Sequence, residues 1–411
     1  MRVVGEGAEH AVFRRDGEPV VWRLSKKRQI FAQTAVRFEK WVARDWLGNK
    51  FVPRSCVCAV PKVVASGSES CYRRADIWQP NYFCSPSVGL LTPDVTQRWL
   101  ALRLGDETVG ASFAVELKPK QAGKTRSWLI EPSRALLKSE FSRIRITRAA
   151  KGGFARAMAT FDSDYHALFD NHRKSMRQTI ESGLRHQAGP VVGCFIQGER
   201  VSVHDQPSLV AAVVTGALGQ EQILQRLQTA QKEFDCLDVD GIGILLAAPQ
   251  LANLDIKTLL ACRSVGSKLS EKAKAAARLC CCPPGVFLKM TPNAREECRE
   301  KAVYAINKLD VADLVDLLHN WLIALMLDDV SIIVSAARLE SPVSCRSQTQ
   351  DHAGVVRLSA SESYVYAIAV VDACPKSISK LKEKSDDEEW NCTRANTSLG
   401  PGVKLSQVKS S

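Results

Sequence analysis

Alternating hydrophobic and polar positions predict a small antiparallel sheet at the start of the chain. The apolar pair Val3-Val4 precedes the glycine-containing segment Gly5-Glu6-Gly7, and Asp16-Gly17 is a dipeptide typical of a tight hairpin turn. Another apolar run follows at residues 19–24 and carries one cation, Arg23. We therefore predict three short strands with a glycine loop between the first two.

The next hundred residues alternate between helical and extended patterns. Apolar residues recur at three- and four-residue spacing over residues 30–46, which predicts an amphipathic helix. Residues 56–64 and the apolar run 87–94, which ends at Pro93-Asp94, read as extended segments. A glycine loop, a strand-borne cation and then an extended link follow the order of a kinase small lobe. In that arrangement the backbone near Asp94 would contact the adenine.

A further strand ends in two lysines on either side of a proline. Apolar residues at 113, 115 and 117 alternate with Glu116 and Lys118, so we expect these two side chains on one face, away from the core. Pro119 ends the ladder because it lacks a backbone N–H, and Lys120 follows it.

The pattern becomes mainly helical beyond residue 160. It predicts helices near 168–184, 223–234, 251–307 and 314–326, with a hairpin about Gln197-Gly198. Asp329 stands just before an apolar strand at 331–335, and Asp372 stands just after another at 364–371. If these two strands pair antiparallel, Asp329 and Asp372 become neighbours at one end of the ladder.

Two neighbouring carboxylates repel each other unless a cation lies between them. Mg²⁺ bound to nucleotide phosphates fits such a place because it uses one or two carboxylates plus phosphate oxygens. One aspartate would then deprotonate an attacking hydroxyl while the other holds the metal. The alternative is a pair of exposed acids at the ends of two strands.

The positive charge of the chain is concentrated. The 411 residues carry a net charge of +12, and the segment from Glu116 to Arg156 alone holds eleven Lys or Arg against three acids. This concentration of positive charge predicts a polyanionic partner, which can be a phosphorylated small molecule, a nucleic acid or an acidic membrane. Nucleic acid is the least favoured, because few aromatic side chains accompany the basic ones. A solvated basic surface is the alternative on charge alone.

No segment has the length and apolarity of a membrane span or a secretory signal, so we expect a soluble, cytoplasmic or nuclear protein. We also expect it to act as a monomer. The fourteen cysteines are scattered, and a reducing compartment keeps such residues as small buried hydrophobes. The run Cys280-Cys281-Cys282 lacks the two-to-four-residue spacing of structural zinc pairs, so the sequence alone does not assign a zinc site there.

Several short motifs, in order along the chain, resemble those of the inositol-pentakisphosphate 2-kinases. The hallmark Glu-Ile-Lys-Pro-Lys of that family is similar to the segment 116–120, and its glycine-containing start is similar to Gly5-Glu6-Gly7. Other segments that resemble family motifs are 143–151, 167–171, 237–241, 327–333 and 371–376. The resemblance extends from residue 5 to about residue 380.

This resemblance implies an α+β, two-lobed kinase-like fold with inositol-phosphate-binding insertions. Residues 1–112 would form the N-lobe with its antiparallel sheet, residues 113–390 the larger C-lobe, and residues 391–411 a disordered tail. The implied reaction transfers phosphate from ATP, with Mg²⁺, to the 2-hydroxyl of inositol 1,3,4,5,6-pentakisphosphate and forms phytate. The alternatives are an impaired relative that only binds inositol polyphosphates, and a kinase for another inositol polyphosphate.

The resemblance also implies a role for individual residues. Asp329 would be the catalytic base and a metal ligand, and Asp372 the second metal ligand. The nucleotide-binding residues would be Gly5, Glu6, Gly7, Arg23 and Asp94. The substrate-binding residues would be Lys118, Lys120, Arg143, Lys151, Lys376 and Lys380. The chain departs from the family at Thr147, which replaces a histidine, and at Asp328, which replaces a lysine.

Overall fold

The computed structural model describes the greater part of the chain. The described residues are 2–6, 10–14, 20–25, 31–59, 88–96, 109–120, 137, 143–152, 165–169, 172–186, 189–202, 205–256, 259–260, 268–280, 286, 289–339, 354–372, 387, 390–395 and 397. Helices and antiparallel sheets share these residues, so the predicted α+β class is confirmed.

Backbone contacts divide the chain into two compact units. The first comprises Met1–Lys118, Ile180–Gln222 and Val330–Cys374, and the second comprises Pro119–Thr179, Ile223–Asp329 and Pro375–Ser411. The division falls within one helix, α7 (Arg173–His186). The lobe boundaries expected from the sequence, 1–112 and 113–390, stay a prediction.

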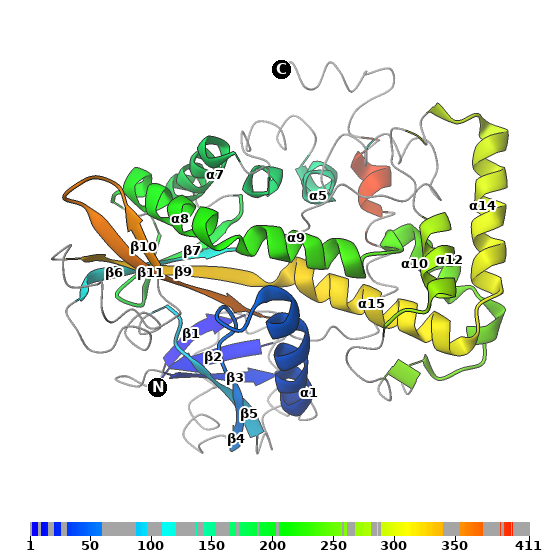
Figure 1. Ribbon diagram of the computed structural model, residues 1–411, viewed down its shortest axis with the longest axis horizontal. Helices are drawn as coiled ribbons and strands as arrows, with labels where there is room; N and C mark the ends of the chain where they lie inside the picture. Colours follow the sequence, from blue (N-terminus) through cyan, green and yellow to red (C-terminus); the bar gives the residue numbers. More distant parts are fainter. Residues whose placement is uncertain are drawn as a thin grey trace. The chain divides into compact units, whose positions relative to one another are not determined.

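A five-stranded antiparallel sheet opens the first unit (Figure 1). Its strands follow the order β1-β2-β3-β5-β4. They are β1 (Arg2–Glu6), β2 (His10–Arg14), β3 (Val20–Ser25), β4 (Cys56–Ala59) and β5 (Val88–Pro93). The three predicted N-terminal strands are therefore confirmed. Arg23 of β3 lies between Val12 of β2 and Leu90 of β5.

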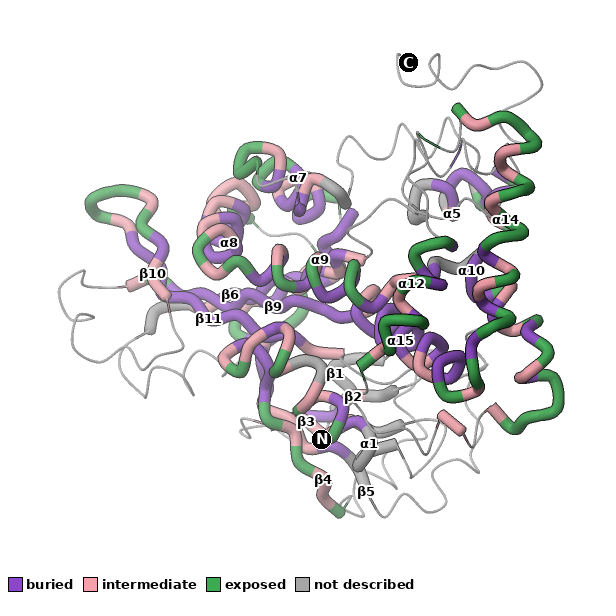
Figure 2. Tube along the Cα trace, turned by 45° about the vertical axis from the view of Figure 1, so that its right-hand side comes forward, coloured by how far each residue is buried: buried purple, intermediate pink, exposed green. Residues whose placement is uncertain are grey.

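A six-stranded antiparallel sheet forms the centre of the first unit, in the order β10-β11-β9-β6-β7-β8. Its strands are β6 (Val109–Leu117), β7 (Val191–Ile196), β8 (Glu199–Val201), β9 (Ser331–Leu339), β10 (Gly354–Arg357) and β11 (Ser363–Val371). The neighbouring inner strands β11 and β9 are buried along most of their length, as the purple tube shows in Figure 2. The predicted hairpin is confirmed: Gln197 and Gly198 both have positive φ, which two-residue hairpin turns of type I′ require.

Helices flank both sheets of the first unit. α1 (Phe31–Phe38) continues directly into a π-helical segment, η1 (Glu39–Leu47), and together they fill the predicted helix at 30–46. α8 (Pro207–Glu221) packs on β9, β10 and β11. Its apolar residues surround the helix, which suits an element that is covered on most sides.

The second unit is helical in its described part. Its helices are α5 (Arg143–Gly152), η4 (Tyr165–Leu168), α9 (Ile223–Phe234), α10 (Asp238–Leu246), η5 (Pro249–Leu251), α12 (Glu271–Leu279), α14 (Pro292–Asn307) and α15 (Val311–Asp329). α15 packs along α9 (Figure 1), and its buried Trp321 belongs to a core that α15 shares with α10, α12 and α14. It ends at Asp329. Among the described helices, none combines the length and hydropathy that a membrane span needs.

The segment expected to be a disordered tail begins with structure. Residues 391–395 are helical, and the side chains of Cys392 and Ala395 are buried. These two residues are three positions apart, so they share one face of the helix, and that face is apolar.

Candidate active site

The predicted strand pairing beside the two aspartates is confirmed. β9 and β11 are antiparallel, and Ser331 lies opposite Val371 where their ladder ends. Asp372 follows Val371 directly and has φ of 66°, in the left-handed region that aspartate adopts more readily than most residues. The chain therefore turns sharply out of β11 at the residue that carries the carboxylate.

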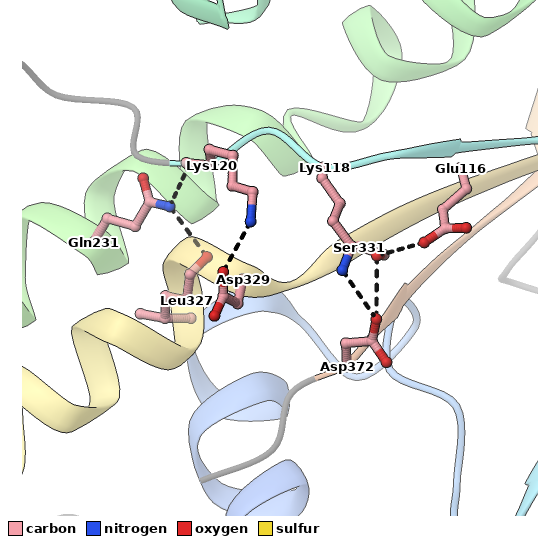
Figure 3. A network of polar contacts seen from close by, with 8 residues as sticks. All are labelled: Glu116, Lys118, Lys120, Gln231, Leu327, Asp329, Ser331 and Asp372. Atoms are coloured by element: carbon pink, nitrogen blue, oxygen red, sulfur yellow. Dashed lines mark hydrogen bonds and ion pairs between the residues drawn. The ribbon is translucent and has the colours of Figure 1, made fainter. Parts of the chain in front are cut away.

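Two cations and one hydroxyl surround the Asp372 carboxylate (Figure 3 shows Lys118 and Ser331). Arg23 lies 2.7 Å from Oδ1, and the Lys118 ammonium lies 3.7 Å from Oδ2. The Ser331 hydroxyl is 3.3 Å from Oδ2. These groups come from β3, the end of β6, and β9, so both sheets of the first unit meet at Asp372. About one third of the Asp372 side chain remains exposed to solvent, where a ligand can reach it.

Glu39 is a carboxylate that the sequence pattern did not single out. It is the first residue of the π-helical segment, a rare geometry that is often found near functional sites. Burial raises the pKa of Glu39 to about 7, while a hydrogen bond from Ser55 and the charges of Arg23 and Arg44 partly oppose that rise. Glu39 is therefore a titratable group whose charge acts on Arg23.

Glu116 lies deeper than expected. The alternation along β6 placed its side chain away from the core, but the residue is only half-exposed and Ser331 donates a hydrogen bond of 2.8 Å to its Oε1. Glu116 and Lys118 do share the less buried face of the strand, but this face meets polar groups of the same sheet as well as solvent, so Glu116 is less exposed than predicted. Burial raises the pKa of the Glu116 carboxyl, and the Ser331 hydrogen bond partly lowers it. A Cβ atom at Gly193 would approach Glu116 Oε2 to 3.2 Å, so the neighbouring strand leaves just enough room for the carboxyl.

One hydroxyl proton cannot serve both carboxylates that Ser331 contacts. If Glu116 is protonated, its own proton can go to the Ser331 oxygen, and the serine proton is then available to Asp372. Burial, which raises the pKa of Glu116, makes its protonation easier than that of an exposed carboxyl. The contacts that run from Glu116 through Ser331 to Asp372 can thus fix the direction of one oxygen of the Asp372 carboxylate.

Asp329 is held by a different cluster, within the second unit. The Lys120 ammonium lies 2.9 Å from Asp329 Oδ1, and each of these two side chains is about one third exposed. Asp329 is the last residue of α15, at the negative end of the helix dipole, where a carboxylate is unfavourable and a nearby cation offsets the cost. Lys120 has φ of 57°, a backbone region that costs a non-glycine residue roughly 1–2 kcal/mol.

Gln231 of α9 ties the backbones of these two segments together. Its buried amide nitrogen donates to the carbonyl of Lys120 at 2.8 Å and to the carbonyl of Leu327 at 3.1 Å (Figure 3). The Leu327 carbonyl is one of the last four in α15, which have no partner inside their own helix. Gln231 therefore binds both sides of the Lys120–Asp329 pair.

Asp94 has a different environment from the one expected of a nucleotide contact. Its buried carboxylate forms an ion pair with Arg14 Nε at 2.5 Å and accepts hydrogen bonds from the backbone and hydroxyl of Thr96. Arg14 also donates to the carbonyl of Gly198. The Arg14 side chain thus joins the two sheets of the first unit, and Asp94 holds that arginine in place. A nucleotide contact at Asp94 stays a prediction.

The remaining predicted residues are placed in part. Gly5 and Glu6 lie in β1, where the pairing with β2 shifts register between Val3 and Gly5. Arg143 and Lys151 both lie in α5, so the helix that their spacing requires is present, and Lys151 is exposed. Gly7, Lys376 and Lys380 lie outside the described residues, and so does the Arg143 side chain.

Sequence reasoning missed the polar residues that act on the predicted ones. Ser331 occupies the first position of an apolar strand, which is a visible signal, since a hydroxyl at the start of a buried run needs a partner. Gln231 gives no such signal, because a glutamine within an amphipathic helix is most often exposed. In the described part of the chain, no group of three or more His, Cys, Asp or Glu side chains could hold a metal ion.

Comparison with known proteins agrees with this geometry. The chain matches the family described as inositol-pentakisphosphate 2-kinase over residues 4–389, which is nearly its whole length. A search of individually curated proteins gave no match. The matched span contains both cation–carboxylate clusters, around Asp329 and around Asp372. The chain therefore belongs to the inositol-pentakisphosphate 2-kinase family.

Proposed function

We propose that the protein transfers the γ-phosphoryl group of ATP to the 2-hydroxyl of inositol 1,3,4,5,6-pentakisphosphate and thereby forms inositol hexakisphosphate. Family membership supports a kinase that acts on inositol phosphates. The observation that carries the proposal is the 2.9 Å pair of Lys120 and Asp329. It places a cation that can bind a substrate phosphate beside a carboxylate that can accept a hydroxyl proton.

The proposed chemistry at Asp329 is general base catalysis. As the substrate oxygen bonds to phosphorus and the bond to ADP breaks, the hydroxyl proton passes to the Asp329 carboxylate. Lys120 would hold a neighbouring phosphate of the substrate, since an ammonium forms a short, charge-assisted hydrogen bond with a phosphate oxygen. A phosphate that draws Lys120 toward itself would also leave more of the Asp329 carboxylate free for the hydroxyl.

The proposed role of the Asp372 cluster is to bind the nucleotide phosphates together with Mg²⁺. The donor set fits that ion: Asp372 offers a partly exposed carboxylate, and hard oxygen ligands are the ones that Mg²⁺ prefers. When bound, Mg²⁺ would neutralise charge on the phosphates. Arg23 can bind phosphate oxygens through its planar guanidinium, and Lys118 can do so through its ammonium.

The test is a direct assay of phosphoryl transfer. The purified protein is incubated with radiolabelled ATP and Mg²⁺ against inositol tetrakisphosphates and inositol pentakisphosphate, and the products are separated by charge. We expect label in inositol hexakisphosphate, with the pentakisphosphate as the best substrate. Transfer to none of these compounds by a folded protein would disprove the proposal. Preferential transfer to a tetrakisphosphate would show a different specificity.

A second candidate is a protein that binds inositol polyphosphates without turnover. Asp328 and Thr147 favour it, because they stand where the family motifs that this chain resembles have a lysine and a histidine, so one cation and one imidazole are lost. Calorimetric titration with inositol hexakisphosphate separates the two candidates. Tight binding with no transfer in the radiolabel assay would establish the second.

A further inference from the structure

We infer that Gln231 is a positioning residue that holds Lys120 and Asp329 in the geometry needed to receive the inositol phosphate. The inference rests on the proposed function, because it assigns Lys120 to the substrate and Asp329 to the proton. Gln231 donates hydrogen bonds to the backbone on both sides of the pair. These three residues and Leu327 all belong to the second unit.

Lys120 needs a support from outside its own segment. Its φ of 57° lies in the left-handed region, which side chains other than glycine, asparagine and aspartate rarely adopt. Gln231 Nε2 donates a 2.8 Å hydrogen bond to its carbonyl and so favours this conformation over the common extended one. The direction of the lysine side chain follows from that backbone conformation.

The end of α15 also needs a partner. The helix terminates at Asp329, and its last carbonyl groups have no N–H of the helix to accept. Gln231 donates its second amide proton to the Leu327 carbonyl at 3.1 Å. This hydrogen bond fixes the final turn, and therefore the residue that presents the Asp329 carboxylate.

The contacts of Gln231 close a ring. From Gln231 the connection runs through the Lys120 backbone and side chain to Asp329, and back through the last turn of α15 to Leu327 (Figure 3). Both amide protons of Gln231 are used, and the side chain is buried, so water cannot replace them at low cost. Gln231 thus sets the separation of the cation and the carboxylate without touching the substrate.

The test combines Gln231→Leu with Lys120→Met in a double-mutant cycle, with steady-state kinetics for inositol pentakisphosphate and for ATP. Gln231→Leu keeps the volume and removes both donors. We expect its KM for the inositol phosphate to rise tenfold or more, while KM for ATP stays within twofold. In the Lys120→Met background the same substitution should raise the inositol phosphate KM less than twofold further, because the cation that it positions is absent. Gln228→Leu, the same substitution at a half-buried position of α9, is the matched control and should leave activity unchanged.

Several outcomes would overturn the inference. An equal loss from Gln231→Leu in both backgrounds, or equal rises in both KM values, would show a general structural role. An unaffected Gln231→Leu enzyme would show no role at all. If this variant fails to fold by circular dichroism, Gln231→Met, which has a more flexible side chain, takes its place in the same cycle. Absence of turnover in the wild-type protein would instead count against the proposed function. Calorimetric titration of inositol hexakisphosphate into the same variants would then test only whether Gln231 positions Lys120 for phosphate binding.

Discussion

The two aspartates of this protein are held in opposite ways. Asp372 lies at the end of a sheet, where Arg23, Lys118 and Ser331 reach its carboxylate from three strands or strand ends. Asp329 lies at the end of a helix, where Lys120 forms an ion pair with it. A carboxylate contacted by two cations and a hydroxyl suits the binding of a metal ion and phosphates. A carboxylate paired with a partly exposed lysine can give up that lysine to a substrate phosphate and then accept a proton.

The largest expected effect separates the two aspartates. Asp329→Asn should lower kcat roughly a thousandfold or more, because an amide cannot accept the hydroxyl proton, while inositol phosphate affinity stays nearly unchanged. Asp372→Asn should instead raise the Mg²⁺ concentration needed for half-maximal activity, about a hundredfold. Kinetics with Mg²⁺ and each substrate varied would measure both. Small, equal losses would mean that both acids are surface residues without a role.

The next effect compares the two lysines beside Pro119. Lys120→Ala should raise the inositol phosphate KM about tenfold, as expected for one lost charge-assisted contact, with little change in KM for ATP. Lys118→Ala should change both constants, since this ammonium contacts the carboxylate that we assign to metal and nucleotide. Steady-state kinetics with each substrate varied would decide. If the two variants change both KM values by the same factors, the Asp329 and Asp372 clusters do not have separate roles.

A smaller effect tests the hydrogen bonds to Asp372. Ser331→Ala should raise the Mg²⁺ requirement about threefold to tenfold, the range expected for one hydrogen bond. Glu116→Gln should stay within twofold of wild type, because an amide can donate to the Ser331 oxygen as a neutral carboxyl does. The Mg²⁺ dependence of initial rates measures both. A greater loss for Glu116→Gln than for Ser331→Ala would show that Glu116 acts as an anion.

The smallest effect concerns stability. Because burial raises the pKa of Glu39 to about 7, its neutral form stabilises the fold, fully below pH ~4.5 and progressively less as pH rises through 7. The loss is about 3 kcal/mol at most. Glu39→Gln should therefore lose less unfolding free energy than wild type between pH 5 and pH 8. Urea denaturation at both values measures this.

The exposed Glu233 of α9, in the second unit, supplies the matched control. Glu233→Gln should follow the wild-type pH dependence, since an exposed carboxyl has nearly the same environment in the folded and unfolded chain. If Glu39→Gln behaves as this control does, Glu39 is ionised in the folded protein across the range. The pH sensitivity would then not distinguish the first unit from the second.

The sequence predicted the strands and the acids better than it predicted their neighbours. The pairing of β9 and β11 follows from two apolar runs, and Asp329 and Asp372 are marked by their places at the ends of those runs. Local periodicity carries this information because a strand buries alternate or all side chains. The contacts of Ser331 with Glu116 and of Gln231 with Lys120 join residues 215 and 111 positions apart. Only the tertiary structure reveals such pairs, and for the same reason the sequence pattern overestimated the exposure of Glu116.

The strand order of the six-stranded sheet constrains how the chain can fold as it is synthesised. β6 ends at Leu117, yet its neighbour β9 begins at Ser331 and the last strand, β11, ends at Val371. Until the ribosome has produced those residues, one edge of β6 has no partner, and exposed strand edges promote aggregation. The centre of the first unit is thus completed last, and a chain truncated before β9 would keep this edge open.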